Sequence, residues 1–222
     1  IEEESPAPWV AYGPIYLKES PPPMGVVQRS EADILHELEI TGLTHVFAGS
    51  ENGVRGIDLR IQPGTFNVVT GRIGAGKTTF LRTVLGVLPL QSGEIRWNGE
   101  SVADPKTFFA PPRCAYTPQV PRLFSETLAD NILMGLPGGE EVLQRAVRLG
   151  VMEEDLPTLE LGLETMVGPR GVKLSGGQVQ RTAAARMFVR EAELYVFDDL
   201  SSALDVETEN LLWDRVFAAR QG

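Results

Sequence analysis

Nine consecutive residues, from Gly71 to Thr79, have the types and spacing of a loop that binds phosphate groups. They read Gly-Arg-Ile-Gly-Ala-Gly-Lys-Thr-Thr and match the pattern G-x-x-x-x-G-K-S/T at every position. Glycines let the backbone curl until several N–H groups point at one anion, and a following helix adds partial positive charge. Lys77 would reach the β- and γ-phosphates of a nucleotide, and the Thr78 hydroxyl would bind Mg²⁺.

Two carboxylates, Asp198 and Asp199, follow the apolar run Leu194–Phe197. A continuous apolar run is typical of a strand buried on both faces. A carboxylate at the carboxyl end of such a strand faces the crevice where phosphates bind and can help to hold Mg²⁺. By itself the pair could be a solvated acidic turn, but the phosphate-loop pattern upstream favours a metal-binding role.

The segments that flank the loop predict the elements that it needs. Thr65–Thr70 is rich in β-branched and apolar residues, which favours a strand. Residues 79–85 carry apolar side chains at helical spacing, and Gly86 can end that helix. The alternative, a chance glycine-rich turn, does not explain a strand and a helix on either side.

The rest of the chain predicts a layered domain behind a linker. Residues 1–33 are rich in proline and favour a linker from a preceding domain, and residues 34–222 would form the nucleotide-binding domain. We expect strands at 38–41, 44–47, 53–61 and 93–99, as an antiparallel layer that leads into the nucleotide core. We also expect a short strand at 115–119, helices at 127–134, 140–149 and 177–189, and a last helix capped by Asp205.

The composition narrows the classes of protein. The chain has 222 residues, 42% of them hydrophobic, which is enough for a packed core. Its net charge of −10 disfavours nucleic acid as a partner. The single cysteine, Cys114, suits a reducing compartment and is expected to be buried. No apolar run approaches the roughly 18 residues that span a bilayer, the acidic start does not resemble a signal peptide, and the lack of an initial Met suggests a piece of a longer protein.

Further motifs follow in chain order. Leu174–Gln178 reads Leu-Ser-Gly-Gly-Gln and resembles the signature sequence of the ATP-binding cassette (ABC) family. Gln119 precedes it, and the acid pair and residues 202–205 follow it, in the order of that family. From about Leu38 onward, the chain resembles the nucleotide-binding domain of an ABC transporter. The resemblance implies an α/β P-loop NTPase (RecA-like) core with a mostly parallel sheet, an antiparallel β subdomain and a helical signature subdomain at about 120–178.

The resemblance also implies roles for single residues. ATP would contact Phe47, Val54, Gly71, Ile73, Gly74, Ala75, Gly76, Lys77, Thr78, Thr79, Ser175, Gly177 and Gln178. Mg²⁺ would be held by Thr78, Gln119 and Asp198. Asp199 would act as general base on the attacking water, with Gln119 sensing the metal and that water.

Some of these roles need a second copy of the domain. Ser175 and Gly177 would contact the γ-phosphate of ATP held by that copy, which implies a head-to-tail dimer around two ATP molecules. Asp205 would reach across the same interface, although helix capping alone would also explain this residue. Phe47 stands where the family has an aromatic ring that stacks on adenine, with a core strand aromatic as the alternative.

The subtype follows from two segments, 121–132 and 165–171, which resemble exporter-type members. The second has Met166 and Pro169 where the family usually has Glu, at positions that contact the membrane domain. We therefore expect a transmembrane domain upstream of Ile1 as partner, which would hold this domain at the cytoplasmic face of the cell membrane.

Two departures from the family pattern concern catalysis. Asp199 stands where Glu is usual, so we expect weak hydrolysis with ATP binding intact. The family's switch histidine lies on the strand after the last helix, whereas His36 and His45 both precede the phosphate loop. We expect that strand and its histidine to be missing from this sequence, which ends at Gly222. The alternatives are a catalytically degenerate domain of a heterodimeric transporter and a soluble ABC protein of translation or DNA repair, which the acidic charge and the exporter-like segments disfavour.

Overall fold

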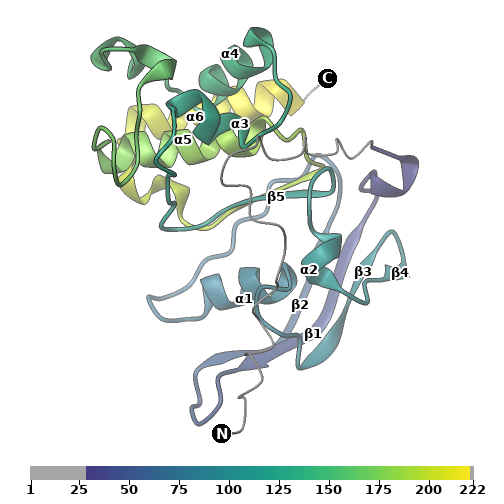
Figure 1. The fold of residues 1–222 in the computed structure, drawn as a ribbon. Helices are drawn as coiled ribbons and strands as arrows, with labels where there is room; N and C mark the ends of the chain where they lie inside the picture. Colours follow the sequence, from purple (N-terminus) through teal and green to yellow (C-terminus); the bar gives the residue numbers. More distant parts are fainter. Residues whose placement is uncertain (1–28, 221–222) are drawn as a thin grey trace, which may run out of the picture.

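A computed structural model describes residues 29–220 of the chain. Its helices and strands are β1 (Leu38–Val46), β2 (Gly53–Ile61), α1 (Lys77–Val84), β3 (Ser92–Trp97), β4 (Glu100–Ser101), α2 (Pro105–Phe108), β5 (Cys114–Thr117), α3 (Leu128–Leu133), α4 (Glu140–Leu149), α5 (Gly176–Phe188), β6 (Leu194–Phe197) and α6 (Val206–Arg220). Figure 1 shows the sheet of β1–β4 on one side of the molecule, helices α3–α6 on the other, and β5 between them. Of the expected linker, residues 1–28 lie outside the described residues.

The antiparallel layer has the strand order β2-β1-β3-β4, so β1 is flanked by β2 and β3. A bulge at Gly42, with φ of 61°, interrupts β1. The bulge changes which positions face inward, because Leu38 and Ile40 are buried before it and Leu43 and His45 after it. The two strands predicted at 38–41 and 44–47 are therefore one bulged strand.

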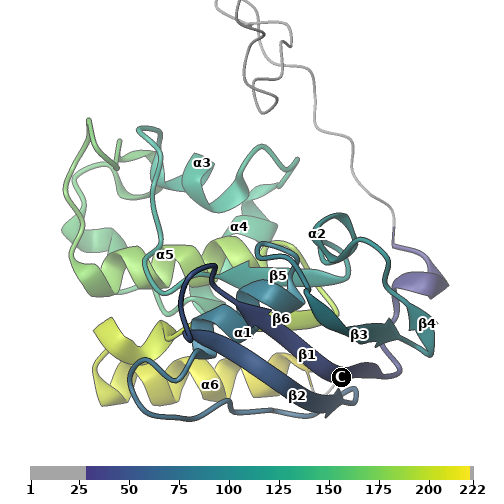
Figure 2. The same cartoon turned by 90° about the horizontal axis from the view of Figure 1, so that it is seen from below.

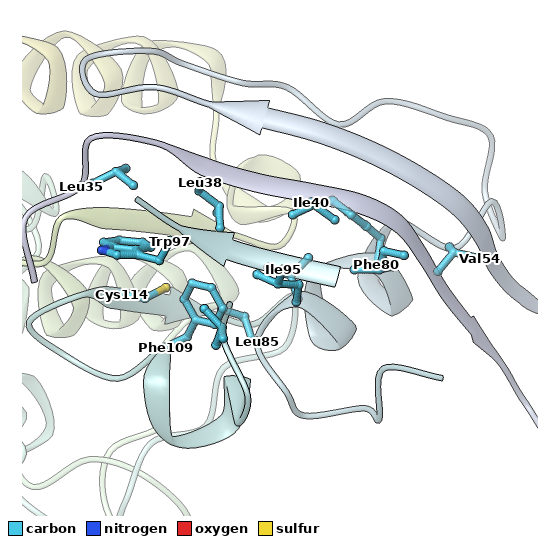
Figure 3. Close-up of a cluster of buried hydrophobic side chains, with 13 residues drawn as sticks. Leu35, Leu38, Ile40, Val54, Phe80, Leu85, Ile95, Trp97, Phe109 and Cys114 are labelled. Carbon is cyan, nitrogen blue, oxygen red and sulfur yellow. The ribbon is translucent and has the colours of Figure 1, made fainter. Parts of the chain in front are cut away.

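The first core lies beneath this sheet. Figure 3 shows Trp97, Phe109 and Cys114 at one end of the core and Phe80 and Val54 at the other. All five side chains are buried, which confirms the expected burial of the cysteine. Burial raises the pKa of the Cys114 thiol to about 12, so the group is neutral and unreactive in the folded chain.

A second core joins the helices on the other side. Leu128 and Ile132 of α3, Val147 of α4 and Ala185 of α5 are packed together and almost fully buried. Small residues on α5 let the neighbouring helices approach closely. Ala184, one residue before, instead faces a third cluster with α6 and β6. Helix α5 is therefore the element on which both helical clusters are built.

A parallel pair, β5 and β6, connects the two sides in the register Cys114↔Leu194 to Thr117↔Phe197. The expectation that residues 194–197 are buried on both faces was wrong, since all four are half-buried. The physical reason is that β5 is the only strand paired with β6 among the described residues.

The strand predicted at Thr65–Thr70 is also absent. This segment is extended and exposed, with Val68 at 67% of its maximal accessibility. No strand of the described chain lies beside it to accept its backbone hydrogen bonds, so its β-propensity has no partner. Figure 2 shows the connection from β2 to α1 running past α6, where Phe66 packs against Trp213 and Phe217.

The helix predictions were close to the observed boundaries. Helix α1 begins at Lys77 rather than Thr79, and α3, α4 and α5 end within two residues of the expected positions. Asp205 caps α6 as predicted, because its carboxylate accepts the Thr208 N–H at 2.8 Å. No helix among residues 29–220 is long and apolar enough to span a membrane.

Candidate functional site

The glycine loop turns sharply before α1 by using left-handed backbone conformations. Gly74 has φ of 80°, and Gly76, the N-cap of α1, has φ of 92°. A Cβ atom on Gly76 would lie 2.7 Å from Val54 Cγ1 and 3.1 Å from the Gly53 carbonyl oxygen. Only glycine can therefore bring the loop this close to β2. No side chain caps the first turn of α1, which leaves its N–H groups available to an anion.

The ammonium group of Lys77 lies back over the loop. Its Nζ donates to the carbonyl oxygens of Gly71 at 3.0 Å and Arg72 at 3.3 Å. Ile73, at the outer turn of the loop, is fully exposed, and Ala75 N donates to the Arg72 carbonyl at 3.0 Å. The Lys77 ammonium group and a curl of backbone amides thus occupy a single exposed turn, which is the arrangement that binds phosphate.

Two of the three residues predicted to hold a metal, Thr78 and Asp198, meet at the start of α1, whereas the third, Gln119, contacts Asp199. The Thr78 hydroxyl donates to Asp198 Oδ1 at 2.9 Å, although the two residues are 120 positions apart. Neighbouring ligand oxygens of octahedral Mg²⁺ lie about 2.9 Å apart, so this pair fits the ion. No group of three or more His, Cys, Asp or Glu in the described part of the chain could hold a metal by itself. Phosphate oxygens and water would complete the shell, as is usual for Mg²⁺.

Tyr116 is a residue of this site that sequence reasoning missed. Its hydroxyl donates to Asp198 Oδ2 at 3.3 Å, so the buried carboxylate is held from both sides. Burial raises the pKa of Tyr116, and the Asp198 charge adds to the effect. The only sequence signal is its place in β5, where it pairs with Val196, two residues before Asp198.

The second carboxylate meets the predicted glutamine. Gln119 Nε2 donates to Asp199 Oδ2 at 2.9 Å. The parallel register explains the contact. Thr117 pairs with Phe197 at the end of the two strands, and Gln119 and Asp199 each lie two positions after these residues. Asp199 adopts φ of 60°, a left-handed conformation that Asp tolerates better than most residues. The site residues from β5, β6 and α1 are therefore within reach of one another.

The signature residues form the start of α5. Ser175 is its N-cap, with Oγ accepting the Gln178 N–H at 3.2 Å while Gln178 Oε1 accepts the Ser175 N–H at 2.9 Å. This capping box leaves the Ser175 hydroxyl proton free to donate. A Cβ atom on Gly177 would lie 3.0 Å from the Ala203 carbonyl oxygen, so this corner touches the segment before α6. Within residues 29–220, no hydrogen bond joins the corner to the phosphate loop.

Phe47 and Val54 lie in different environments. Phe47 directly follows β1, is 43% exposed and packs edge-on against His45 with ring centroids 4.9 Å apart. Part of the Phe47 ring is therefore accessible at the surface. Val54 is buried beside Gly76, so in this structure it supports the glycine loop.

The fold and the site define a P-loop nucleotide-binding domain of mixed α/β structure. A sequence profile of the ABC transporter family matches residues 54–202. This match covers more than half of the chain, which therefore belongs to the ABC transporter family as an ATP-binding domain.

The relatives include several exporters. The multidrug resistance-like ATP-binding protein MdlA of Buchnera aphidicola is 35% identical over 71% of this chain and 27% of its own length. The ATP-dependent lipid A-core flippase of Shewanella frigidimarina is 34% identical over 79% of this chain and 30% of its own. A bacterial Atm1-family ABC exporter with ATP bound has a similar structure, with a TM-score of 0.75 and 26% identity over 84% of this chain and 33% of that one. The chain thus spans a third or less of the length of these relatives.

Proposed function

We propose that this domain binds ATP with Mg²⁺ in the glycine loop and hydrolyses it slowly to drive an exporter. The observation that carries the proposal is the meeting of Thr78 with Asp198 and of Gln119 with Asp199, beside a loop that carries the Lys77 ammonium group. Four side chains, from the start of α1 and from the segments that directly follow β5 and β6, are thus brought together. Such convergence is the requirement for positioning a metal-bound phosphate and an attacking water.

Each residue of the site has a distinct part in the proposed reaction. The loop amides and Lys77 bind the phosphate oxygens and stabilise the charge that grows on them. Thr78 and Asp198 would hold Mg²⁺, which neutralises phosphate charge when bound. Gln119 orients the water, and Asp199 accepts its proton as the water attacks the γ-phosphorus. The bond from that phosphorus to the bridging oxygen breaks, and ADP leaves.

The dimer follows from the corner at the start of α5. Ser175 retains a hydroxyl donor, and the first turn of this helix offers backbone N–H groups. Among residues 29–220, no hydrogen bond joins this corner to the phosphate loop, so we assign its ligand to the ATP of a second copy. Closure of two copies around two ATP molecules would then drive the conformational change of the transporter.

Three apolar side chains form the surface that we assign to the membrane domain. Phe124, Met166 and Val172 are each about half exposed. Their segments are joined, since Val172 N donates to the Met166 carbonyl at 2.8 Å and Arg170 N donates to Ser125 Oγ at 3.2 Å. We call Phe124, Met166 and Val172 the docking surface and assign it to a cytoplasmic segment of the transporter's membrane domain. An apolar surface here suits an apolar partner helix, because Met166 replaces a charged residue.

Substitution of Asp198, one of the two residues that we propose to bind Mg²⁺, provides the test of this function. ATP affinity is measured by calorimetry with Mg²⁺ and with EDTA, for the unmodified chain and for Asp198→Asn. Mg²⁺ should tighten ATP binding to the unmodified chain by tenfold or more and should have little effect on the variant. Glu100→Gln, on the exposed strand β4, is the matched control and should behave as the unmodified chain. An equal Mg²⁺ effect in Asp198→Asn would show that this carboxylate does not bind the metal.

A further inference from the structure

The loop at 121–126 connects β5 to α3 without regular secondary structure, yet one side chain holds its backbone at two points. The Phe124 N–H donates to Asn131 Oδ1 at 2.8 Å, and Asn131 Nδ2 donates to the Phe124 carbonyl at 3.0 Å. The same Nδ2 group donates to the Thr127 carbonyl at 3.0 Å. Asn131 is 1% exposed. A single buried amide therefore gives Phe124 the two hydrogen bonds that a neighbouring strand would give.

Arg186, near the end of α5, holds the same amide from the other side. Its Nε donates to the Asn131 carbonyl at 2.7 Å, and its Nη2 donates to Asn131 Oδ1 at 3.1 Å. Its Nη1 donates to the Arg122 carbonyl at 3.1 Å, and the guanidinium lies 5.9 Å from the Phe124 ring centroid. The planar fork of Arg thus joins α5, α3 and the loop at once.

Partial burial of the Arg186 charge costs free energy of desolvation, which is hard to explain if the contacts serve stability alone. No carboxylate in the described part of the chain forms an ion pair with Arg186, and burial lowers its pKa, with Arg190 adding to the effect. Even a buried ion pair can often be replaced by well-packed apolar side chains without loss of stability, and the half-buried Arg186 lacks the attraction of such a pair. An apolar residue could not bind these three acceptor oxygens, two from Asn131 of α3 and one from Arg122 of the loop. The geometry therefore indicates that the position of the loop matters more than the energy of the contacts.

We propose that Asn131 and Arg186 form a clamp that makes the docking surface and the signature corner move as one rigid body. Helix α5 connects the two regions: it has 13 residues and is about 20 Å long, with Ser175 capping one end and Arg186 near the other. Phe124 of the docking surface is fixed to α5 through the clamp and not through secondary structure of its own. The inference rests on the proposed function for what the two ends contact, but the clamp itself can be tested without nucleotide.

Native-state hydrogen exchange of the unmodified chain tests the clamp first. If the loop and α5 move as one rigid body, the Phe124 amide should exchange with the same denaturant dependence as the amides of α5 around Arg186. Exchange of Phe124 through a separate opening of much lower energy would overturn the proposal. No substitution is needed for this measurement, so a failure to fold cannot obscure it.

Two substitutions then test the parts. Asn131→Asp keeps the shape but loses the donors to Phe124 and Thr127, and Arg186→Lys keeps the charge but cannot reach three acceptors. Both should lower the protection of the Phe124 amide by about tenfold or more and should speed tryptic cleavage after Arg122.

Asn98→Asp is the matched control. The Asn98 side chain brackets the backbone of another segment, accepting from His36 N at 2.7 Å and Glu37 N at 3.0 Å and donating to the Ile34 carbonyl at 2.7 Å. This variant should lower thermal stability without changing exchange at Phe124. If it loosens Phe124 as much as Asn131→Asp does, the effect is a general loss of stability and the proposal is wrong.

The coupling itself has a separate readout. In the unmodified chain, ATP with Mg²⁺ should slow exchange at Phe124, because closure at Ser175 is passed along α5. Asn131→Asp and Arg186→Lys should still bind ATP with unchanged affinity but lose this slowing. Persistence of the slowing in both variants would overturn the clamp. Absence of ATP binding by the unmodified chain would instead refute the proposed function and leave the exchange results to decide the clamp.

Discussion

Substitution of Asp199 by Glu should raise the rate of ATP hydrolysis without changing ATP affinity. Asp199 follows Asp198, the proposed metal ligand, after the end of β6, and its Oδ2 accepts from Gln119 Nε2 at 2.9 Å. This hydrogen bond holds the Asp199 carboxylate at Gln119, short of the expected position of the attacking water. One added methylene would extend the carboxylate by about 1.5 Å towards the attacking water.

The size of the gain follows from the geometry. A displacement of about 1 Å in a reacting group can cost roughly 100-fold in rate, which corresponds to about 2.7 kcal/mol. The left-handed backbone at this position, with φ of 60°, suits Asp better than Glu. This strain acts on folding stability and not on the barrier, so we expect kcat to rise by between tenfold and 100-fold with a slightly lower Tm.

The assay is steady-state phosphate release at protein concentrations that span dimerisation, with ATP affinity measured in parallel. Asp199→Asn is the control, because it keeps the size of the side chain and removes the base, and it should reduce hydrolysis to background. Equal rates for Asp199→Glu and the unmodified chain, at equal affinity, would refute the placement of Asp199 as a base that is too short. Equal rates for Asp199→Asn and the unmodified chain would show that Asp199 is not the base.

Three further predictions concern the scaffold. Gly76→Ala should lower the free energy of unfolding by about 1–3 kcal/mol and weaken ATP binding, because φ of 92° is strained for alanine and its Cβ would meet Val54; chemical denaturation and calorimetry measure the two effects. The Ser30 N–H and hydroxyl lower the pKa of Asp33, so the stabilisation is full above its unfolded pKa of about 3.9 and is lost as pH falls through the lower folded pKa. The loss of Tm in Asp33→Asn should therefore be largest at neutral pH and shrink below about pH 4, and a constant difference would contradict this reasoning. Cys114, whose pKa is raised to about 12 by burial, should react with thiol reagents at pH 8 only when the chain unfolds, and rapid labelling of the folded chain would contradict its burial.

The parts of the site that depend on local geometry could be predicted from the sequence. The glycine loop and the start of α1 follow from the phosphate-loop pattern, because φ values such as that of Gly76 are readily open only to glycine. The capping box of Ser175 and Gln178 is also a local pattern, S-x-x-Q, which predicts the helix start that the structure has. Gln178 was predicted only as a nucleotide contact, although its spacing from Ser175 was a readable signal for the box.

What failed depends on partners distant in the chain. The segment 65–70 has the composition of a strand, but a strand requires a neighbour, and none of the described strands pairs with it. Tyr116 and the clamp of Asn131 with Arg186 were missed for the same reason. The hydrogen bonds of Tyr116 with Asp198 and of Arg186 with Asn131 join residues 55 or more positions apart, and nothing in the local pattern of β5, α3 or α5 distinguishes these side chains from ordinary polar residues.

Calorimetric titration of ATP with Mg²⁺ into the chain tests the central claim, that the loop before α1 is the nucleotide site. The chosen variant is Lys77→Ala, with Lys106→Ala on the exposed side of α2 as a control of equal charge change. Our account predicts saturable binding by the unmodified chain and by Lys106→Ala, and at least tenfold weaker binding by Lys77→Ala, about 1.4 kcal/mol or more. Equal binding by all three proteins, or binding by none, would contradict it.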